Sequence, residues 1–172
     1  MKYLSFFAFL ILMPISAFGA EKSTLASNGV EVTISGDEFD GRIEYTSPMT
    51  TFGEHSFFLV AKIRKNGEPA GPVIIAGYVF YKGEWRQYDA ANFRGGESAE
   101  AIFNDRDVVT CSGSGNCTLS EGFRIFLSKE QIRKYARDGF VDLKLKASAS
   151  SQEPIIRVPL KHIEAIMEVG DS

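Results

Sequence analysis

The stretch VIIAGYVFY at residues 73–81 decides the fold class, because no other stretch after residue 20 is as continuously apolar. Its nine residues carry no charge, and they do not alternate between apolar and polar as a strand with one face in water does. Its β-branched residues and its length argue against a buried helix. The stretch therefore predicts a strand that is covered on both faces.

Lys82-Gly83 follows directly and favours a tight reversal of the chain, since Gly83 can adopt a positive φ. The residues beyond the reversal would then return as a second strand. In that register Gly77 faces Tyr88, so that an aromatic ring covers a glycine. The sequence thus predicts a central hairpin.

Shorter apolar segments on either side of this hairpin also have the pattern of strands. Apolar and polar residues alternate in most of them, which is typical of strands with one face in the core. Seven or more short strands separated by turn residues indicate an antiparallel β-sandwich, immunoglobulin-like in the loose architectural sense. The predicted strands, besides residues 73–81, are 30–35, 39–45, 57–64, 108–111, 122–127, 141–146 and 155–158.

Two short helices are predicted near the C-terminus. In the first, at residues 129–138, Ser128 as N-cap and Gln131 three residues later form a capping box, and Gly139 provides a Schellman terminus. In the second, Pro159 suits the first turn, and apolar residues recur after it at helical spacing. These apolar residues are Leu160, Ile163, Ile166 and Met167.

The first residues have the pattern of a cleavable secretory signal peptide. Lys2 supplies the positive start, residues 3–15 are an apolar core, and small residues suit cleavage after Gly19 or Ala20. Pro14 interrupts the apolar run before it reaches the roughly 20 residues that a membrane span needs. We therefore expect no transmembrane anchor after cleavage, and a protein that is periplasmic or secreted by a bacterium.

This assignment divides the chain into three parts. We expect a signal peptide at residues 1–19, a flexible lead-in at residues 20–29, where the sequence is polar and small, and a single β-sandwich domain at residues 30–172. A domain of this length has room for a substantial core.

The formal net charge of the whole chain is −3. This mild acidity gives no reason to expect a nucleic-acid partner, because nucleic-acid-binding domains are usually basic. Residues 129–146 nevertheless carry six bases against three acids. These bases are able to attract an anionic lipid or a cell-wall polymer, but a solvated polar face is the simpler interpretation.

Cys111 and Cys117 are the only cysteines and enclose Ser-Gly-Ser-Gly-Asn. In an exported protein such a close, even pair indicates a disulfide, here one that pins a turn between two strands. A metal site needs more ligands than this pair supplies, and a redox pair usually has the closer Cys-x-x-Cys spacing.

No arrangement of residues predicts a catalytic site, a metal site or a cofactor. His55 lies between Glu54 and Ser56, but neighbours on a strand point to opposite faces and cannot form a nucleophile–base pair by adjacency. His162 is expected on the surface of the second helix. A further group of acids lacks the ligand spacing of a calcium loop and fits a solvated turn, namely Asp37, Glu38 and Asp40.

The candidate binding residues are aromatic. Aromatic side chains on a sheet face are able to stack on sugars or to hold a partner, but they also fill cores. The core is the simpler interpretation, with Trp85 and Tyr88 as the expected exceptions. The candidate binding face consists of Trp85, Tyr88, Tyr81 and Phe93, within a group that also includes Tyr78.

The order of features at residues 111–167 resembles the C-terminal part of the bacterial invasion-associated locus B proteins. Two close cysteines precede a short strand, a helix that ends in Ala-Arg-Asp-Gly, an alternating strand and then Ile-Ile-Arg-Val-Pro-Leu-Lys-His-Ile. That family consists of exported β-rich domains without an established enzymatic activity. The resemblance implies a host-related or envelope-related binding role and supplies no catalytic residue.

Two functions are consistent with these patterns. The first is an exported, non-enzymatic binding or interaction module of the periplasm or cell envelope, whose partner is a protein or an envelope component. The alternative is a small periplasmic enzyme or ligand carrier with a pocket built from non-local residues. A pocket lined by two or more convergent ionisable groups, His55 among them, would favour the alternative, and a flat exposed aromatic face would favour the module.

Overall fold

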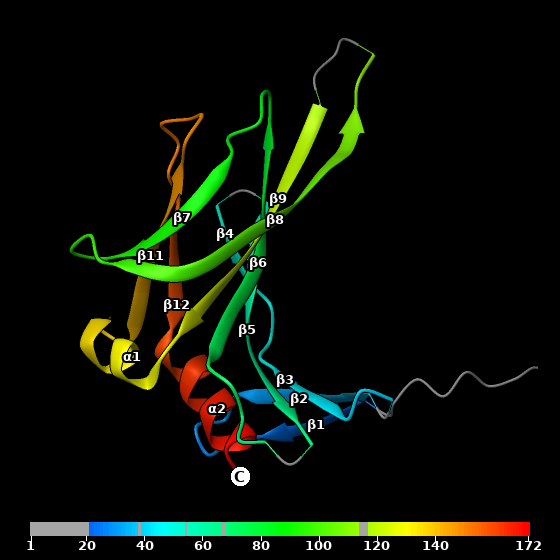
Figure 1. Cartoon of the computed structure of the whole chain (residues 1–172), viewed down its shortest axis with the longest axis vertical. Helices are drawn as coiled ribbons and strands as arrows, with labels where there is room; N and C mark the ends of the chain where they lie inside the picture. The colour runs from blue at the N-terminus through cyan, green and yellow to red at the C-terminus, as the bar shows by residue number, and fades with distance from the viewer. Residues whose placement is uncertain (1–20, 38, 54, 67, 114–116) are drawn as a thin grey trace, which may run out of the picture.

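A computed structural model describes residues 21–37, 39–53, 55–66, 68–113 and 117–172. The predicted signal peptide lies outside the described residues. The described chain is mainly antiparallel β with two helices, α1 (Lys129–Tyr135) and α2 (Leu160–Gly170) (Figure 1). The strands are β1 (Lys22–Leu25), β2 (Glu31–Asp37), β3 (Arg42–Thr46), β4 (Thr50–Phe52), β5 (Ser56–Lys65), β6 (Val73–Lys82), β7 (Tyr88–Phe93), β8 (Ser98–Cys111), β9 (Cys117–Leu127), β10 (Ala136–Arg137), β11 (Phe140–Ala147) and β12 (Ile155–Pro159).

Hydrogen bonds join the described strands into one twelve-stranded sheet. Its order is β1-β2-β3-β5-β6-β9-β8-β7-β11-β10, with β12 beside β11 and β4 beside β5. In Figure 1, β7, β11 and β12 form one side of the molecule and β5, β6 and β9 the other. Buried side chains from both sides belong to a single core cluster. The architecture is therefore sandwich-like, as the sequence predicts.

The apolar strand β6 is central, with β5 on one edge and β9 on the other. Val73, Ile75 and Val79 point into the core, so the predicted strand is present, with one face fully covered. The predicted cover of the second face is wrong towards the end of the strand, where Ala76 and Phe80 are half-buried and Tyr78 is 37 % exposed. The predicted hairpin after Lys82-Gly83 is wrong, because β7 pairs with β8 and β11 instead of β6. A glycine covered by an aromatic ring is nevertheless present: Gly77 lies opposite Phe123 of β9, not opposite Tyr88.

The predicted flexible lead-in is wrong for residues 21–29. Strand β1 pairs antiparallel with β2, and Ala26 is buried in the core. The chain then contacts α2, where the backbone N–H and the hydroxyl of Ser27 donate to the Glu168 carboxylate at 2.9 and 2.6 Å. Asn28 donates to the carbonyl of Lys161 at 2.8 Å. Polar residues thus form structure here through backbone pairing and contacts with the last helix.

The first helix is shorter than its pattern predicts. The capping box between Ser128 and Gln131 is confirmed, but the helix ends at Tyr135. Ala136–Arg137 then pairs with the start of β11 as a two-residue strand. Asp138 and Gly139 have φ values of 50° and 79°, so Gly139 serves the turn of a hairpin and not the end of a helix.

An ion pair between a buried lysine on β5 and a partly exposed aspartate directly after α2 joins the two elements. The side chain of Lys62 is 2 % exposed, and its ammonium contacts the Asp171 carboxylate directly after α2. Lys129 pairs with the same carboxylate at 3.0 Å. Gly170 allows the close approach, because a Cβ there would stand 3.1 Å from Cδ of Lys62. The end of α2 is thereby fixed against the core face of β5.

Candidate ligand-binding cleft

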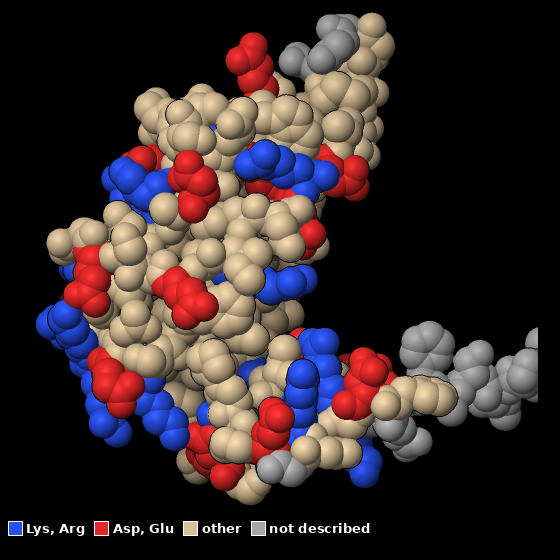
Figure 2. Space-filling model, in the orientation of Figure 1, with Lys and Arg blue, Asp and Glu red and all other residues tan. Residues whose placement is uncertain are grey.

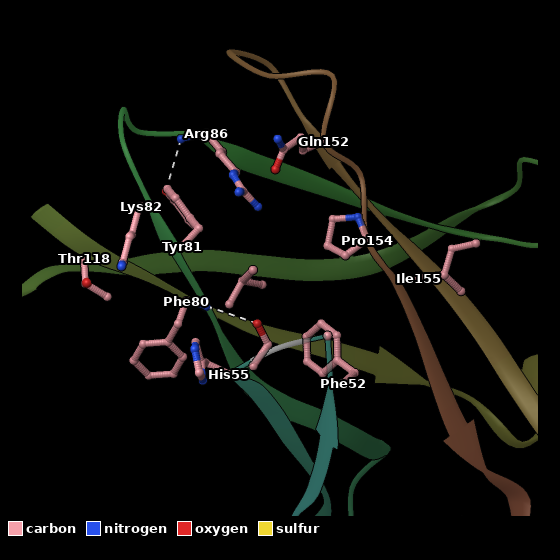
Figure 3. Close-up of a pocket in the computed structure, with 13 residues that line it drawn as sticks. Phe52, His55, Phe80, Tyr81, Lys82, Arg86, Thr118, Gln152, Pro154 and Ile155 are labelled. Atoms are coloured by element: carbon pink, nitrogen blue, oxygen red, sulfur yellow. Dashed lines mark hydrogen bonds between the residues drawn. The ribbon is translucent and has the colours of Figure 1, made fainter. Parts of the chain in front are cut away.

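A cleft of about 820 Å³ opens where β6 continues beyond the end of β5. The pairing of β5 with β6 ends at Phe57 and Tyr78, so residues 79–82 have β9 as their only strand neighbour. The β4–β5 turn and the loop between β11 and β12 flank this open edge (Figure 3). The volume lies within the range of small-molecule sites.

One side of the cleft comes from the tight turn between β4 and β5. Phe52 pairs with Ser56, and Gly53 has a φ of 62°, which favours glycine at that position of the turn. The Ser56 hydroxyl accepts a hydrogen bond from the backbone N–H of Phe80 at 3.1 Å (dashed in Figure 3). Ser56 thus takes the place of a strand partner for β6, and the turn holds His55 at the cleft.

Arg86 enters the cleft from the loop between β6 and β7. Its guanidinium lies over the Tyr81 ring, 4.1 Å from the ring centroid, and its Nη1 donates to the Tyr88 hydroxyl at 3.2 Å. The Tyr88 hydroxyl donates in turn to the carbonyl of Gln152 at 3.3 Å. In Figure 3 the Arg86 side chain points into the cleft, across from Gln152 and Pro154. The stacking and the hydrogen bond fix the guanidinium before any ligand arrives.

The Glu121 carboxylate holds this loop in place. It is 2 % exposed and accepts hydrogen bonds from the Tyr81 hydroxyl and from the backbone N–H groups of Gln87 and Tyr88, both at 3.0 Å. Arg106 Nε adds a fourth hydrogen bond at 3.1 Å. These contacts explain why residues 83–87 form an anchored loop and not the second strand of a hairpin. They also stabilise the φ of 55° at Gln87.

The two tyrosines of this network remain neutral hydroxyl donors at ordinary pH. Burial raises the pKa of Tyr81 well above its usual value, and the hydrogen bond to Glu121 and that carboxylate's charge raise it further. Burial also raises the pKa of Tyr88, although the hydrogen bond and charge of Arg86 oppose the increase. Both hydroxyls therefore serve to position the loop.

The charge of the cleft is one-sided. Its described lining residues include three basic side chains, Lys82, Arg86 and His55, and no Asp or Glu. None of these three side chains forms an ion pair with a described carboxylate. The other walls are apolar and are formed mainly by Phe52, Val79, Pro154 and Ile155. The arrangement suits a ligand with an anionic group on an apolar body.

The residues of the predicted aromatic binding face do not form one exposed face, although Tyr81 also lines the cleft. Tyr81, Tyr88 and Phe93 are buried, and the expected exception Tyr88 is only 1 % exposed. Phe93 stacks on Tyr135 with ring centroids 4.1 Å apart. Trp85 is half-buried against the core. The alternative interpretation of these aromatics as core is confirmed for the three buried residues.

The predicted disulfide between Cys111 and Cys117 is confirmed. It closes the end of the long β8–β9 hairpin, where the two cysteines face each other across the strands. Among the described residues no group of three or more His, Cys, Asp or Glu side chains is placed to hold a metal ion. Asp37 caps its own turn by accepting from the N–H groups of Phe39 and Asp40, while residue 38 lies outside the described residues.

The bases of residues 129–146 are largely paired. Figure 2 shows basic side chains over the α1 region with acidic ones between them. The pairs are Lys129 with Asp171, Lys134 with Glu97, and both Lys144 and Lys146 with Glu153. His162, on α2, is half-buried, and burial lowers its pKa. The predicted solvated face is therefore better described as a set of surface ion pairs.

Glu121 is the residue of this site that the sequence reasoning missed. Alternation along β9 places it on the same face as Leu119, Phe123 and Ile125, all of which are buried. One acid in line with apolar residues is the signal that identifies a buried carboxylate. Such a carboxylate requires several donors, and they come from distant segments.

Fold and cleft together define the class of protein: a mainly antiparallel β protein with a ligand-sized cleft at the open edge of its central strand. Comparison with protein families, with curated proteins and with solved structures finds no match. Neither helix of the described chain has the length and apolar character needed to span a bilayer.

Proposed function

We propose that this chain is an exported bacterial binding protein of the periplasm or cell envelope, and that its cleft binds an anionic ligand without catalysing a reaction. The observation that carries the proposal is that one cleft is lined by Lys82, Arg86 and His55, which have no carboxylate partners among the described residues. In Figure 3, Lys82 lies with Phe80 on one side of β6, and Arg86 lies over Tyr81 on the other. Ionisable groups that line one cleft and include His55 favour a ligand carrier over a flat interaction module.

The positions of the polar groups favour binding over catalysis. The Ser56 hydroxyl is occupied by the backbone N–H of Phe80, and the buried Glu121 carboxylate by its four donors. The ammonium of Lys82 and the guanidinium of Arg86 are hydrogen-bond donors that suit a carboxylate or phosphate. The apolar walls beside them suit a ring or a short aliphatic body.

Export is supported by the N-terminal signal pattern and by the disulfide, because such bonds persist mainly in oxidising compartments. The resemblance to the invasion-associated locus B proteins supports an envelope-related role in the same way. N-terminal sequencing of the protein recovered from the periplasm of an expressing bacterium tests this part. A mature chain that starts at residue 20 or 21 agrees with export, and an intact Met1 in the cytoplasm contradicts it.

Calorimetric titration of the oxidised protein tests the binding proposal. The probes are phenyl phosphate, benzoate and inorganic phosphate, and we expect the two aromatic anions to bind more tightly than inorganic phosphate. Lys82→Gln and Arg86→Gln should each weaken phenyl phosphate roughly tenfold, as loss of a charge-assisted hydrogen bond does.

Lys65→Gln is the matched control, because Lys65 is exposed at the far end of β5. It should bind phenyl phosphate like the unmodified protein. The proposal fails if no anion binds saturably, or if Lys65→Gln weakens binding as much as Lys82→Gln does.

A further inference from the structure

A second hollow lies next to the cleft, on the outer face of the sheet. Its volume is about 560 Å³, and one wall consists of three aromatic rings, Phe57 on β5 and Tyr78 and Phe80 on β6. Tyr78 is 37 % exposed, and the other two rings are half-buried. We call these three residues the aromatic platform.

The spacing of the rings makes a platform and not a cage. The centroids of Phe57 and Tyr78 and those of Phe57 and Phe80 are 5.8 Å apart, and those of Tyr78 and Phe80 are 6.2 Å apart. These are contact distances between neighbouring rings, which leave no room for an ammonium group between them. A ligand instead has to lie on top of the rings, as the C–H face of a sugar does.

The opposite wall supplies groups that bind hydroxyls. It comes from β8 and includes Asn104, Asp105 and Asp107. Asp105 is 3.9 Å from Arg124, and Arg106 between the two acids turns inward to Glu121. Planar amide and carboxylate groups beside aromatic rings provide the combination that a polyhydroxylated ring needs, namely hydrogen-bonding partners at its edge and an apolar surface under its face.

Phe80 connects the two sites, because it lines both the cleft and the second hollow. A ligand in the cleft is therefore able to continue over Phe80 onto the rings of Phe57 and Tyr78. The charges differ at the two ends of this path. Lys82, Arg86 and His55 lie at the cleft end. The other end has two acids, Asp105 and Asp107, and one base, Arg106, which is paired with the buried Glu121.

We propose that the ligand is an oligosaccharide with a single acidic unit, whose acid occupies the cleft and whose neutral sugars lie on the aromatic platform. This inference rests on the proposed function, since it assigns the cleft to the anionic group. Asp105 and Asp107 disfavour a chain with an acid on every unit, and they disfavour the phosphates of a nucleic acid. The ligand is thus an acidic glycan of low charge density.

A panel of oligosaccharides tests the inference. It spans cell-wall, plant and animal glycans with no acid, with one acidic unit, or with an acid on every unit. The titrated members are aldotetraouronic acid, xylotetraose, tetragalacturonic acid and the monosaccharide glucuronic acid. We expect glycans with one acidic unit, such as aldotetraouronic acid, to bind more tightly than glycans with no acid or with an acid on every unit. The best of them should bind at least tenfold more tightly than the acidic monosaccharide that it contains.

Two variants separate the sites. Tyr78→Leu keeps bulk over Gly122 but removes the ring, and it should reduce the affinity for the best glycan about tenfold while leaving the acidic monosaccharide unchanged. Lys82→Gln should weaken both ligands. Phe39→Leu is the control, because Phe39 is an exposed aromatic on the β2–β3 turn, and it should change neither. Unchanged thermal unfolding of Tyr78→Leu checks that the sheet is intact.

The inference is overturned if no glycan binds better than its acidic monosaccharide, if fully acidic glycans bind best, or if Tyr78→Leu weakens the monosaccharide to the same extent. In those cases binding of phenyl phosphate in the cleft still supports the proposed function. Absence of binding by both the panel and phenyl phosphate overturns the two proposals together.

Discussion

Gly77 of β6 lies directly beneath the ring of Phe123 of β9. A Cβ at Gly77 would stand 2.8 Å from Cζ of Phe123 and 2.2 Å from the carbonyl oxygen of Phe57. The next pair in the register repeats the arrangement on the other face, where a Cβ at Gly122 would stand 3.0 Å from Cε1 of Tyr78. The two central strands therefore pack through two reciprocal glycine–aromatic pairs, one in the core and one below the aromatic platform.

Gly77→Ala should destabilise the protein by about 3 kcal/mol or more, because overpacking costs of this order arise when backbone has to move. The added methyl would meet the backbone of β5 and not only a movable side chain. Urea unfolding monitored by circular dichroism measures the change. Gly36→Ala is the control, since a Cβ at Gly36 of β2 would meet nothing within 4 Å. Equal stability of the two variants would contradict the assigned packing.

Glu121→Gln should lower the free energy of unfolding by about 2–4 kcal/mol, because an amide cannot replace a carboxylate that accepts on both oxygens. Oε1 accepts from Tyr81 and Gln87, and Oε2 from Tyr88 and Arg106, so the NH₂ group would face N–H donors in either orientation. Hydrogen exchange should also rise in residues 83–88. Glu100→Gln, at an exposed position of β8, is the control. It should change neither the free energy of unfolding nor the hydrogen exchange of residues 83–88.

Asp171→Asn should reduce stability at neutral pH but not in acid. Burial raises the pKa of Asp171, but hydrogen bonds and charge from Lys62 and Lys129 outweigh it and hold the pKa below its ordinary value of 3.8. A depressed folded-state pKa contributes stability that is present above about pH 4 and is lost as the pH falls through the folded value. Paired urea unfolding series from pH 7 to pH 2 should therefore converge at the acidic end.

The exposed Asp89 provides the comparison for that series. Asp89 is on β7 and forms no ion pair with Lys62 or Lys129. The free energy of unfolding of Asp89→Asn should therefore equal that of the unmodified protein at every pH. The prediction is contradicted if the free energies of unfolding of the unmodified protein and of Asp171→Asn differ as much at pH 2 as at pH 7. The stabilisation would then not come from the charge of the Asp171 carboxylate.

The sequence predicts the parts of the fold that depend on local patterns. Three local features follow from the sequence: the strand at residues 73–81 from its continuous apolar and β-branched residues, the capping box at Ser128 from hydrogen-bond chemistry, and the Cys111–Cys117 bond from close spacing. The resulting class, mainly antiparallel β with two short helices, is correct, and one of the two helices, α2, is C-terminal. The predicted hairpin fails because the carboxylate that fixes the loop after β6 lies 34 residues further along, on β9.

The cleft was less predictable than the fold. Its side chains come from the β4–β5 turn, the end of β6, the loop after it and the β11–β12 loop, which meet only in the folded sheet. Sequence neighbours therefore give no hint that His55 and Arg86 share a cavity. The same holds for β1, whose exposed side chains show no strand pattern because its stability comes from backbone pairing.

The contact between Ser27 and Glu168 joins positions 141 residues apart. Ile163, Ala165 and Ile166 of α2 are fully buried in the same core that β2 and β5 line. A nascent chain emerging from the ribosome therefore lacks part of its interior until α2 has been synthesised. The strands β2 and β5 consequently reach their final packing only when α2 is present to cover them.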